Sequence, residues 1–241
     1  MRAMLLVVPL LLATGPLPAT SSALILEPVE GGIQPGDGLL DGPSATFTFC
    51  TLNFVFDGLG TKVGKVYIGT AGHCVSQGEV VHTHGFPSFG TVVYDNDGEL
   101  VDFALIEIAS GFHANVLADV RGHPGLPTGT TTSATTQTGD LLLLSGYGLG
   151  WEVTPTTRER RVGALLSDNP TRYRADTLAV FGDSGGPVLH AGTGRALGVI
   201  SAFSFFAIPP ATDAGPTIEG LLPVLAQAGF PVALRTAAPP A

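Results

Sequence analysis

The sequence predicts an all-β fold with one short helix near the C-terminus. Several stretches alternate polar and apolar residues with a period of two, which is typical of half-buried strands. The 33 glycines and 19 prolines of the 241-residue chain supply frequent turns. No segment before residue 215 sustains a helical period. With 44% hydrophobic and 13% charged residues, the composition is that of a globular domain with a sizeable core.

The first 23 residues have the features of a signal peptide. Residues 1–3 carry a positive charge, residues 4–13 are apolar, and the small residues at 21–23 suit cleavage. Prolines and a glycine interrupt the apolar stretch well short of the ~20 residues that a membrane span needs. We therefore expect a secreted, extracellular protein that has no membrane association once residues 1–23 are removed.

Turns and strands follow one another along the rest of the chain. Residues 24–43 are rich in glycine and proline and are expected to form turns. Pro223 fits the first position of a helix and Gly229 the position after it, which predicts a helix over residues 224–228. Residues 235–241 are expected to form a loose tail. Strands are predicted at residues 45–56, 65–70, 79–84, 91–94, 100–108, 141–145, 161–166, 187–190 and 196–202.

Charge and cysteine content narrow the classes of partner. The 20 acidic and 11 basic residues give a formal charge of −9, so the chain lacks the basic surface that nucleic acid or anionic lipid requires. Cys50 and Cys74 are the only two cysteines. In the oxidising environment outside the cell we expect them to form one disulfide, and two free buried thiols are the alternative.

A serine between glycines is the most distinctive motif of the chain. Residues 182–187 read Gly-Asp-Ser-Gly-Gly-Pro, just after an apolar stretch and just before another. A substrate carbonyl can approach Ser184 closely there, and glycines allow backbone N–H groups to point towards a developing negative charge. The alternative is a glycine-rich hairpin that holds an incidental serine.

Two further residues supply what a nucleophilic serine needs, namely a neutral imidazole to take its proton and a carboxylate to orient that imidazole. His73 lies in Thr-Ala-Gly-His-Cys at the end of a predicted strand. Asp102 stands at the head of the apolar stretch Asp-Phe-Ala-Leu-Ile. A buried carboxylate without a partner is costly, and an imidazolium is the natural partner. The alternative for Asp102 is a solvated residue at the start of a strand.

These three motifs, in this order, resemble the signatures of the chymotrypsin/trypsin-like serine endopeptidases. The resemblance is closest to the secreted bacterial streptogrisins and α-lytic-type proteases, and it covers most of residues 29–234. It implies two packed six-stranded antiparallel β-barrels in one protease domain, with a cleft between them. It also implies Ser184 as nucleophile, His73 as general base and then acid, and Asp102 as the group that fixes the imidazole tautomer. The backbone N–H groups of Gly182 and Ser184 would form the oxyanion hole.

The resemblance also bears on maturation and specificity. It implies Val29 as the mature N-terminus, after a short pro-segment at residues 24–28, with its ammonium paired to Asp183. The alternative is that Asp183 bonds locally. The floor of the specificity pocket would fall near Leu178, whose apolar side chain argues against basic substrates.

The same resemblance places Ser201, Ala202 and Phe203 on the wall of that pocket. We therefore expect a preference for small or medium apolar side chains before the cut.

The sequence thus predicts a secreted, monomeric serine endopeptidase that acts on proteins or peptides through an acyl-enzyme intermediate, with no metal or organic cofactor. A catalytically silent binding protein of the same fold and a secreted esterase with the same triad remain as alternatives. His82 and His84 point to one face of a predicted strand and have no third ligand at a recognisable spacing. We expect them to be surface histidines, and metal binding by them stays open.

Overall fold

The computed structural model describes residues 32–40, 42, 48–98, 101–148, 161–177, 179–204 and 212–237, without the side chains of Thr48, Phe203 and Ser204. The predicted signal peptide, Val29 and Leu178 lie outside the described residues. Among the described residues, no helix is both long enough and apolar enough to cross a membrane.

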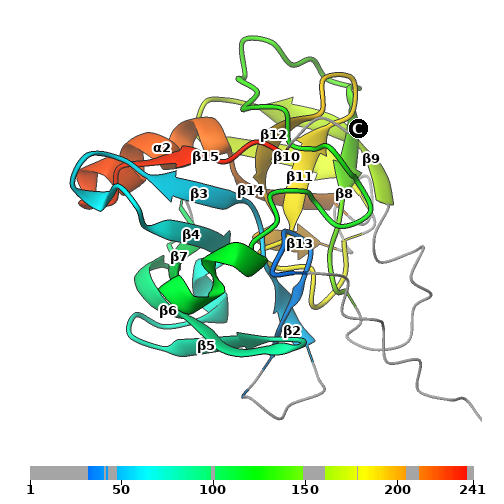
Figure 1. Ribbon diagram of the computed structural model, residues 1–241. Helices are drawn as coiled ribbons and strands as arrows, with labels where there is room; N and C mark the ends of the chain where they lie inside the picture. Colours follow the sequence, from blue (N-terminus) through cyan, green and yellow to red (C-terminus); the bar gives the residue numbers. More distant parts are fainter. Residues whose placement is uncertain are drawn as a thin grey trace, which may run out of the picture. The chain divides into compact units, whose positions relative to one another are not determined.

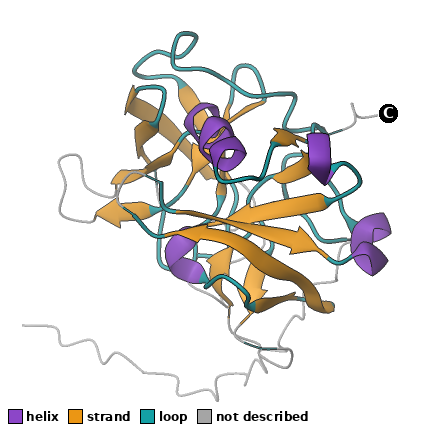
Figure 2. Cartoon of the chain, turned by 90° about the vertical axis from the view of Figure 1, so that its left-hand side faces the viewer, coloured by secondary structure: helices purple, strands orange, loops and turns teal. Residues whose placement is uncertain are grey.

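Strands and loops make up most of the described chain, with a few short helices (Figure 2). The helices are η1 (Gly60–Lys62), η2 (Gly72–Cys74), η3 (Ser110–Asn115) and α2 (Ile218–Gln227). The strands of a first sheet are β1 (Gly38–Leu40), β2 (Thr48–Thr51), β3 (Val55–Gly58), β4 (Val66–Thr70), β5 (Val80–Thr83), β6 (Phe86–Asn96), β7 (Phe103–Ile108) and β15 (Val232–Leu234). Those of a second sheet are β8 (Leu141–Leu144), β9 (Arg161–Asp168), β10 (Arg172–Asp176), β11 (Pro187–His190), β12 (Arg195–Val199), β13 (Ala202–Ser204) and β14 (Thr212–Pro216).

Both sheets are antiparallel and curl into barrel-like shapes, which confirms the predicted fold class. The first has the strand order β15-β3-β4-β7-β6-β5-β1-β2 and the second β12-β11-β8-β9-β10-β14-β13. In Figure 1, β4 to β7 gather in one half of the view and β8 to β12 in the other. The described residues form eight and seven strands where the resemblance implied six and six. Among the additional short strands is β15, which the C-terminal segment adds beside β3.

A shared core ties the two sheets together. Successive side chains of a strand point to opposite faces, and all five residues of β4 are buried. Ile68 therefore packs in the core of the first sheet, whereas Tyr67 packs in a second cluster. That cluster also contains Leu189 from β11 and Val199 from β12. Because its members come from both sheets, this cluster holds the two sheets against each other, and the candidate site lies where they meet.

The C-terminal helix begins earlier than the sequence predicted. Helix α2 starts at Ile218, and the hydroxyl of Thr217 caps it by accepting the N–H of Gly220 at 3.1 Å. Pro223 lies inside the helix on its exposed face, where water can solvate the carbonyl group that loses its partner. The prediction that the helix starts at Pro223 was therefore wrong. Gly229 follows the helix with a φ of +90°, as the position after a helix favours.

The segment after β15 is held to the first sheet. The N–H of Arg235 donates to the carbonyl of Val55 at 2.8 Å, and its guanidinium pairs with Asp57. The N–H of Ala237 donates to the carbonyl of Pro127 at 2.9 Å. The chain is therefore fixed through residue 237, and the expectation of a loose tail from residue 235 fails for these residues.

Candidate active site

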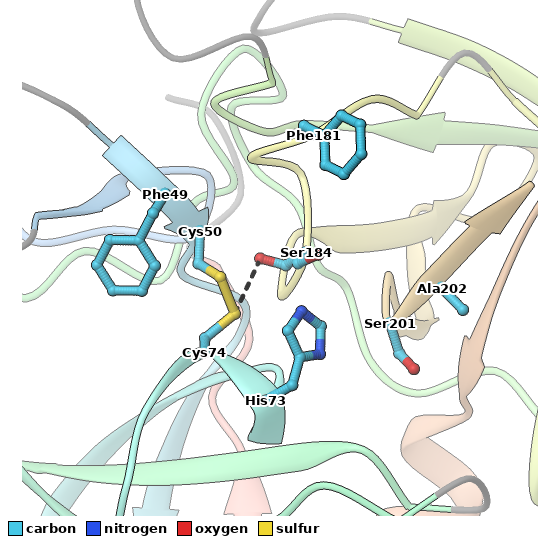
Figure 3. Close-up of a pocket in the computed structure, with 8 residues that line it drawn as sticks. All are labelled: Phe49, Cys50, His73, Cys74, Phe181, Ser184, Ser201 and Ala202. Atoms are coloured by element: carbon cyan, nitrogen blue, oxygen red, sulfur yellow. Dashed lines mark hydrogen bonds between the residues drawn. A yellow bond between two sulfur atoms is a disulfide. The ribbon is translucent and has the colours of Figure 1, made fainter.

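A pocket of about 610 Å³ lies where loops of the two sheets meet (Figure 3). It brings together His73, Ser184, Ser201 and Ala202, which the sequence analysis had assigned to the site. The complete lining consists of Phe49, Cys50, His73, Cys74, Phe181, Ser184, Ser201 and Ala202. Phe49 and the strongly exposed Phe181 are lining residues that the sequence analysis missed.

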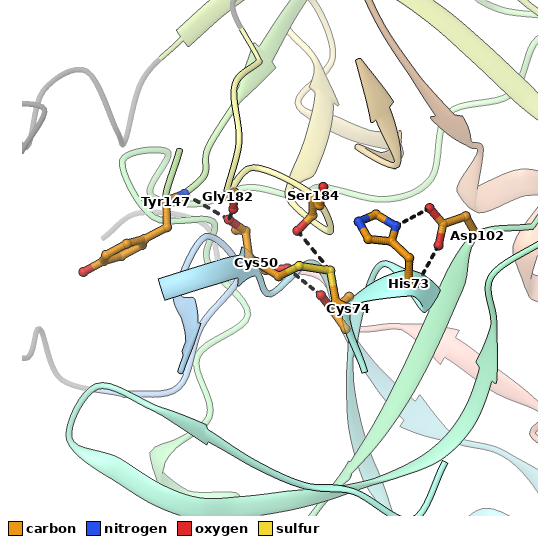
Figure 4. The surroundings of a disulfide bond; sticks show 9 residues. Cys50, His73, Cys74, Asp102, Tyr147, Gly182 and Ser184 are labelled. Atoms are coloured by element: carbon orange, nitrogen blue, oxygen red, sulfur yellow. Dashed lines mark hydrogen bonds and ion pairs between the residues drawn. A yellow bond between two sulfur atoms is a disulfide. The ribbon is translucent and has the colours of Figure 1, made fainter. Parts of the chain in front are cut away.

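His73 and Asp102 form a tightly bonded pair. His73 lies in the short helix η2 after β4, and Asp102 immediately precedes the buried strand β7. The imidazole Nδ1 of His73 lies 2.7 Å from Oδ2 of Asp102, and the backbone N–H of His73 donates to Oδ1 at 2.9 Å. The carboxylate therefore fixes both the ring and the backbone of the histidine. Figure 4 shows Ser184 on the side of the ring away from Asp102.

The contact between the two side chains shifts the pKa values of both His73 and Asp102. The hydrogen bond with Asp102 raises the pKa of His73 above its usual value, burial opposes this, and the charges of Asp102 and Asp97 add to the rise. Burial by itself would raise the pKa of Asp102. Hydrogen bonds from the ring and backbone of His73 and from the hydroxyl of Ser201 nevertheless hold that pKa below its usual value. Ser201 therefore contacts the carboxylate as well as the pocket.

Glycines let the loop of Ser184 approach the first sheet. Gly185 has a φ of +92°, and a Cβ there would lie 2.2 Å from the carbonyl oxygen of Thr51 and 2.3 Å from the hydroxyl of Thr70. Gly182 has a φ of +98°. Within the described part of the chain, the N–H groups of Gly182 and Ser184 donate to no protein acceptor. An incoming oxyanion is the kind of acceptor that such donors bind.

The disulfide between Cys50 and Cys74 is present, as predicted. It joins the end of β2 to η2, so it ties the helical turn that carries His73 to the strand that lies against the Ser184 loop (Figure 4). In the described residues, the single group of side chains with metal-ligand spacing is Cys50, His73 and Cys74, and its two sulfurs form the disulfide. His84, for its part, stacks on Tyr147 with ring centroids 5.7 Å apart.

Asp183 has a partner that the sequence analysis did not foresee. Its carboxylate, which is fully buried, is paired by both terminal nitrogens of Arg161 from the start of β9. The backbone N–H groups of Gly148 and Val180 also donate to it, each at 2.8 Å. Within the described residues the guanidinium of Arg161 is thus the cation that pairs with Asp183, whereas Val29, whose ammonium we had expected there, lies outside them. An ionised carboxylate that is buried without a partner is costly, and that cost was the one signal in the sequence that pointed to a basic partner.

The residues that we expect to form the specificity pocket are described only in part. Leu178, the expected floor, lies outside the described residues. The backbone of Phe203 lies in β13 opposite Asp213 of β14, but its side chain is not described. Asp213 is buried, and its carboxylate accepts the hydroxyls of Thr177 at 2.7 Å and Tyr173 at 3.1 Å. A polar cluster therefore lies beside the strand that borders the pocket.

Comparison with known proteins agrees with this fold. The family model of the trypsin-like peptidase domain matches residues 54–199. Protease A of Thermobifida fusca is 24% identical over 86% of this chain and all of its own, with a TM-score of 0.59. The Nocardiopsis protease is 22% identical over 85% of this chain and all of its own, with a TM-score of 0.58. The Cellulomonas bogoriensis chymotrypsin is 20% identical over the same shares, with a TM-score of 0.56. No curated protein matches the chain.

Two curled antiparallel sheets with a pocket at their junction define the chymotrypsin-like class of fold. Since the family model spans more than half of the chain, the chain belongs to the trypsin-like peptidase family. It is a serine protease, an enzyme that acts on protein or peptide substrates.

Proposed function

We propose that the protein is a secreted endopeptidase that cuts peptide bonds through a triad of Ser184, His73 and Asp102. The observation that carries this proposal is the bonding of His73 to Asp102 through Nδ1, with Ser184 beyond the other edge of the ring. Such an arrangement leaves Nε2 to act on the serine hydroxyl. Gly182 and Ser184 supply the two backbone N–H groups of the oxyanion hole.

The first half of the reaction forms an acyl-enzyme. The hydroxyl oxygen of Ser184 attacks the carbonyl carbon of the scissile bond while Nε2 of His73 takes the hydroxyl proton. The negative charge that develops on the carbonyl oxygen is bound by the two N–H groups, and the positive charge on the imidazole is stabilised by Asp102. When the tetrahedral intermediate collapses, the C–N bond breaks and His73 donates its proton to the leaving amine.

The second half releases the acyl group. Water attacks the ester of Ser184, His73 takes one proton from that water, and a second tetrahedral intermediate forms in the same oxyanion hole. Its collapse breaks the ester bond and returns the proton to the serine oxygen. The carboxylic acid product then leaves, and the free enzyme is restored.

We further propose a preference for small or medium apolar side chains before the cut. The apolar Leu178 at the expected floor and the small Ala202 on the described wall support it. Secretion is supported by the signal-like residues 1–23 and by the disulfide. Residues 24–28 would then form a short pro-segment ahead of the protease domain, and sequencing of the N-terminus of the secreted protein tests this.

Labelling and digestion test the proposal together. A fluorophosphonate probe is expected to label the wild type at Ser184 and to leave Ser184→Ala unlabelled. Digestion of a diverse peptide library is expected to give cuts after apolar residues with the wild type alone. Absence of labelling in the folded wild type would favour the silent binding protein. Hydrolysis of esters without hydrolysis of peptides would favour the esterase, and cuts after Lys or Arg would refute the proposed preference.

A further inference from the structure

Thr51 touches the Ser184 loop at several points although the proposed chemistry gives it no role. It is the last residue of β2, follows Cys50 directly and is fully buried. Its hydroxyl donates to the carbonyl of Gly182 at 2.7 Å and accepts the N–H of Tyr147 at 2.9 Å. Its own N–H donates to the carbonyl of Ser184 at 2.8 Å. One residue of the first sheet therefore binds both residues of the proposed oxyanion hole.

The direction of these bonds distinguishes Thr51 from an ordinary buried threonine. A buried hydroxyl needs partners, and it usually finds them on nearby backbone. Thr83, in the same sheet and equally buried, donates its hydroxyl to the carbonyl of Gly38 in the neighbouring strand at 2.8 Å. The hydroxyl of Thr51 instead crosses to loops of the second sheet. Figure 4 shows Gly182, Ser184 and Tyr147 grouped around the disulfide that Cys50 forms.

These contacts act on the glycines of a segment that is otherwise held through the carboxylate of Asp183 and the N–H groups of Gly185 and Gly186. Gly182 and Gly185 have no side chains to pack, and a glycine populates positive and negative φ almost equally. A peptide group is planar, so fixing a carbonyl fixes the whole unit that contains it. Thr51 fixes the carbonyls of Gly182 and Ser184, whose planar units contain the N–H groups of Asp183 and Gly185. The N–H of Gly182 directly precedes the first of these two fixed units, and the N–H of Ser184 lies between them.

We propose that Thr51 is a positioning residue whose hydroxyl holds the loop so that the N–H groups of Gly182 and Ser184 face the oxyanion. The inference rests on the proposed function, because it assigns a support to the oxyanion hole of that function. Thr51 touches the loop from outside and is not among the residues that line the pocket. Its hydroxyl therefore acts on the transition state and leaves ground-state binding of the substrate unchanged.

The expected loss is smaller than that from deleting a donor. Removing one oxyanion-hole donor lowers kcat by about 10²–10³-fold. Removing the hydroxyl of Thr51 leaves both donors in place, and the bond from its N–H to Ser184 remains. We expect kcat to fall by roughly 10- to 100-fold, with KM changed by less than about twofold, since the interaction is realised mainly in the transition state.

Three variants test the role of the hydroxyl. Thr51→Val keeps the shape and removes the hydroxyl, Thr51→Ser keeps the hydroxyl, and Thr83→Val removes an equally buried hydroxyl elsewhere in the same sheet. The measurements are kcat and KM on a peptide amide, and inhibition by a peptide aldehyde, which forms a tetrahedral adduct, and by the matching alcohol, which does not. Thr51→Val should lose kcat and aldehyde affinity by similar factors and bind the alcohol normally. Thr51→Ser should recover most of both, and Thr83→Val should retain wild-type kcat.

The inference is overturned if folded Thr51→Val keeps wild-type kcat, if Thr83→Val loses as much, or if the loss appears in KM and in alcohol binding. Should Thr51→Val not fold, Thr51→Ala repeats the comparison. If neither variant folds, Thr51 serves folding and the positioning role is rejected. A wild type that is as inactive as Ser184→Ala on peptides refutes the proposed function instead, so the two failures are distinguishable.

Discussion

Replacing Arg161 with methionine should destabilise the protein, because it leaves the carboxylate of Asp183 buried without its cation. Asp183 is fully buried and the side chain of Arg161 is only 12% exposed, so water does not screen the pair. Breaking one partner out of a buried ion pair costs about 3–5 kcal/mol. Two backbone N–H groups, from Gly148 and Val180, still bind the carboxylate. We therefore expect a loss near the lower end, about 3 kcal/mol, in the free energy of unfolding.

A double-mutant cycle in urea separates the pair from its surroundings. Asp183→Asn removes the charge and keeps the shape, so the double variant Arg161→Met with Asp183→Asn should be more stable than Arg161→Met alone. The control is Arg235→Met, which breaks an Arg–Asp pair with Asp57 whose side chains are 27% and 48% exposed. Exposed pairs contribute about 0–1 kcal/mol, so this control should change little.

Two results would refute the reasoning about Asp183. One is an Arg161→Met variant that loses no more stability than Arg235→Met. The other is a double variant whose loss of stability equals the sum of the losses of Arg161→Met and Asp183→Asn, which would show that the two side chains are not coupled. Peptidase activity is expected to fall along with stability in Arg161→Met, because Asp183 precedes Ser184 and anchors its loop.

Three further predictions concern titration and the disulfide. Activity should be lost as pH falls through the raised pKa of His73. In Asp102→Asn the acid limb of the pH profile should move to lower pH, and kcat should drop about 10⁴-fold because the imidazole then adopts the wrong tautomer. An acid limb that does not move would contradict the assignment of Asp102. Burial raises the pKa of Asp213 from 3.8 to about 6, so its contribution to stability is present below about pH 4 and is lost as pH rises through 6. At about 1.4 kcal/mol per pKa unit, wild type should lose about 3 kcal/mol more than Asp213→Asn between pH 4 and 7 in urea titrations, and equal profiles would disprove this. Removing the disulfide by Cys50→Ala with Cys74→Ala opens a loop with a sequence separation of 24 and should cost about 3.5 kcal/mol; a loss below about 1 kcal/mol would show that the linkage adds little.

The fold class was predictable because alternation marks most strands directly. The elements that were missed lack that signal. Strand β10 spans Arg172–Asp176 and alternates charged with buried residues over only five positions. Strand β14 spans Thr212–Pro216 and contains an aspartate, a glycine and a proline, which sequence patterns assign to turns. The predicted strand at residues 45–56 is divided in the structure, since Leu52 to Phe54 lie between β2 and β3 and belong to neither strand.

The parts of the site were predictable to different degrees. Short motifs indicated Ser184, His73 and Asp102, because each of these residues lies in a distinctive run of neighbouring residues. Arg161 lies 22 positions before Asp183, and no local pattern connects them. The contact of Ser201 with Asp102 joins residues that are still farther apart in sequence. Such contacts depend on how the sheets pack, so they become visible only when the fold is known.

The distribution of contacts around Ser184, the proposed nucleophile, suggests why its loop tolerates so many glycines. Gly185 needs to be small because the backbone of Thr51 lies against it, and Gly182 needs a positive φ that glycine adopts without strain. Both requirements remove side chains that would otherwise anchor the loop. The anchoring falls to the fixed groups around it, a threonine on one side and an ion-paired aspartate on the other. We therefore infer that precision at this site depends on Thr51 and Arg161, which lie outside the motif, as well as on Asp183 within it.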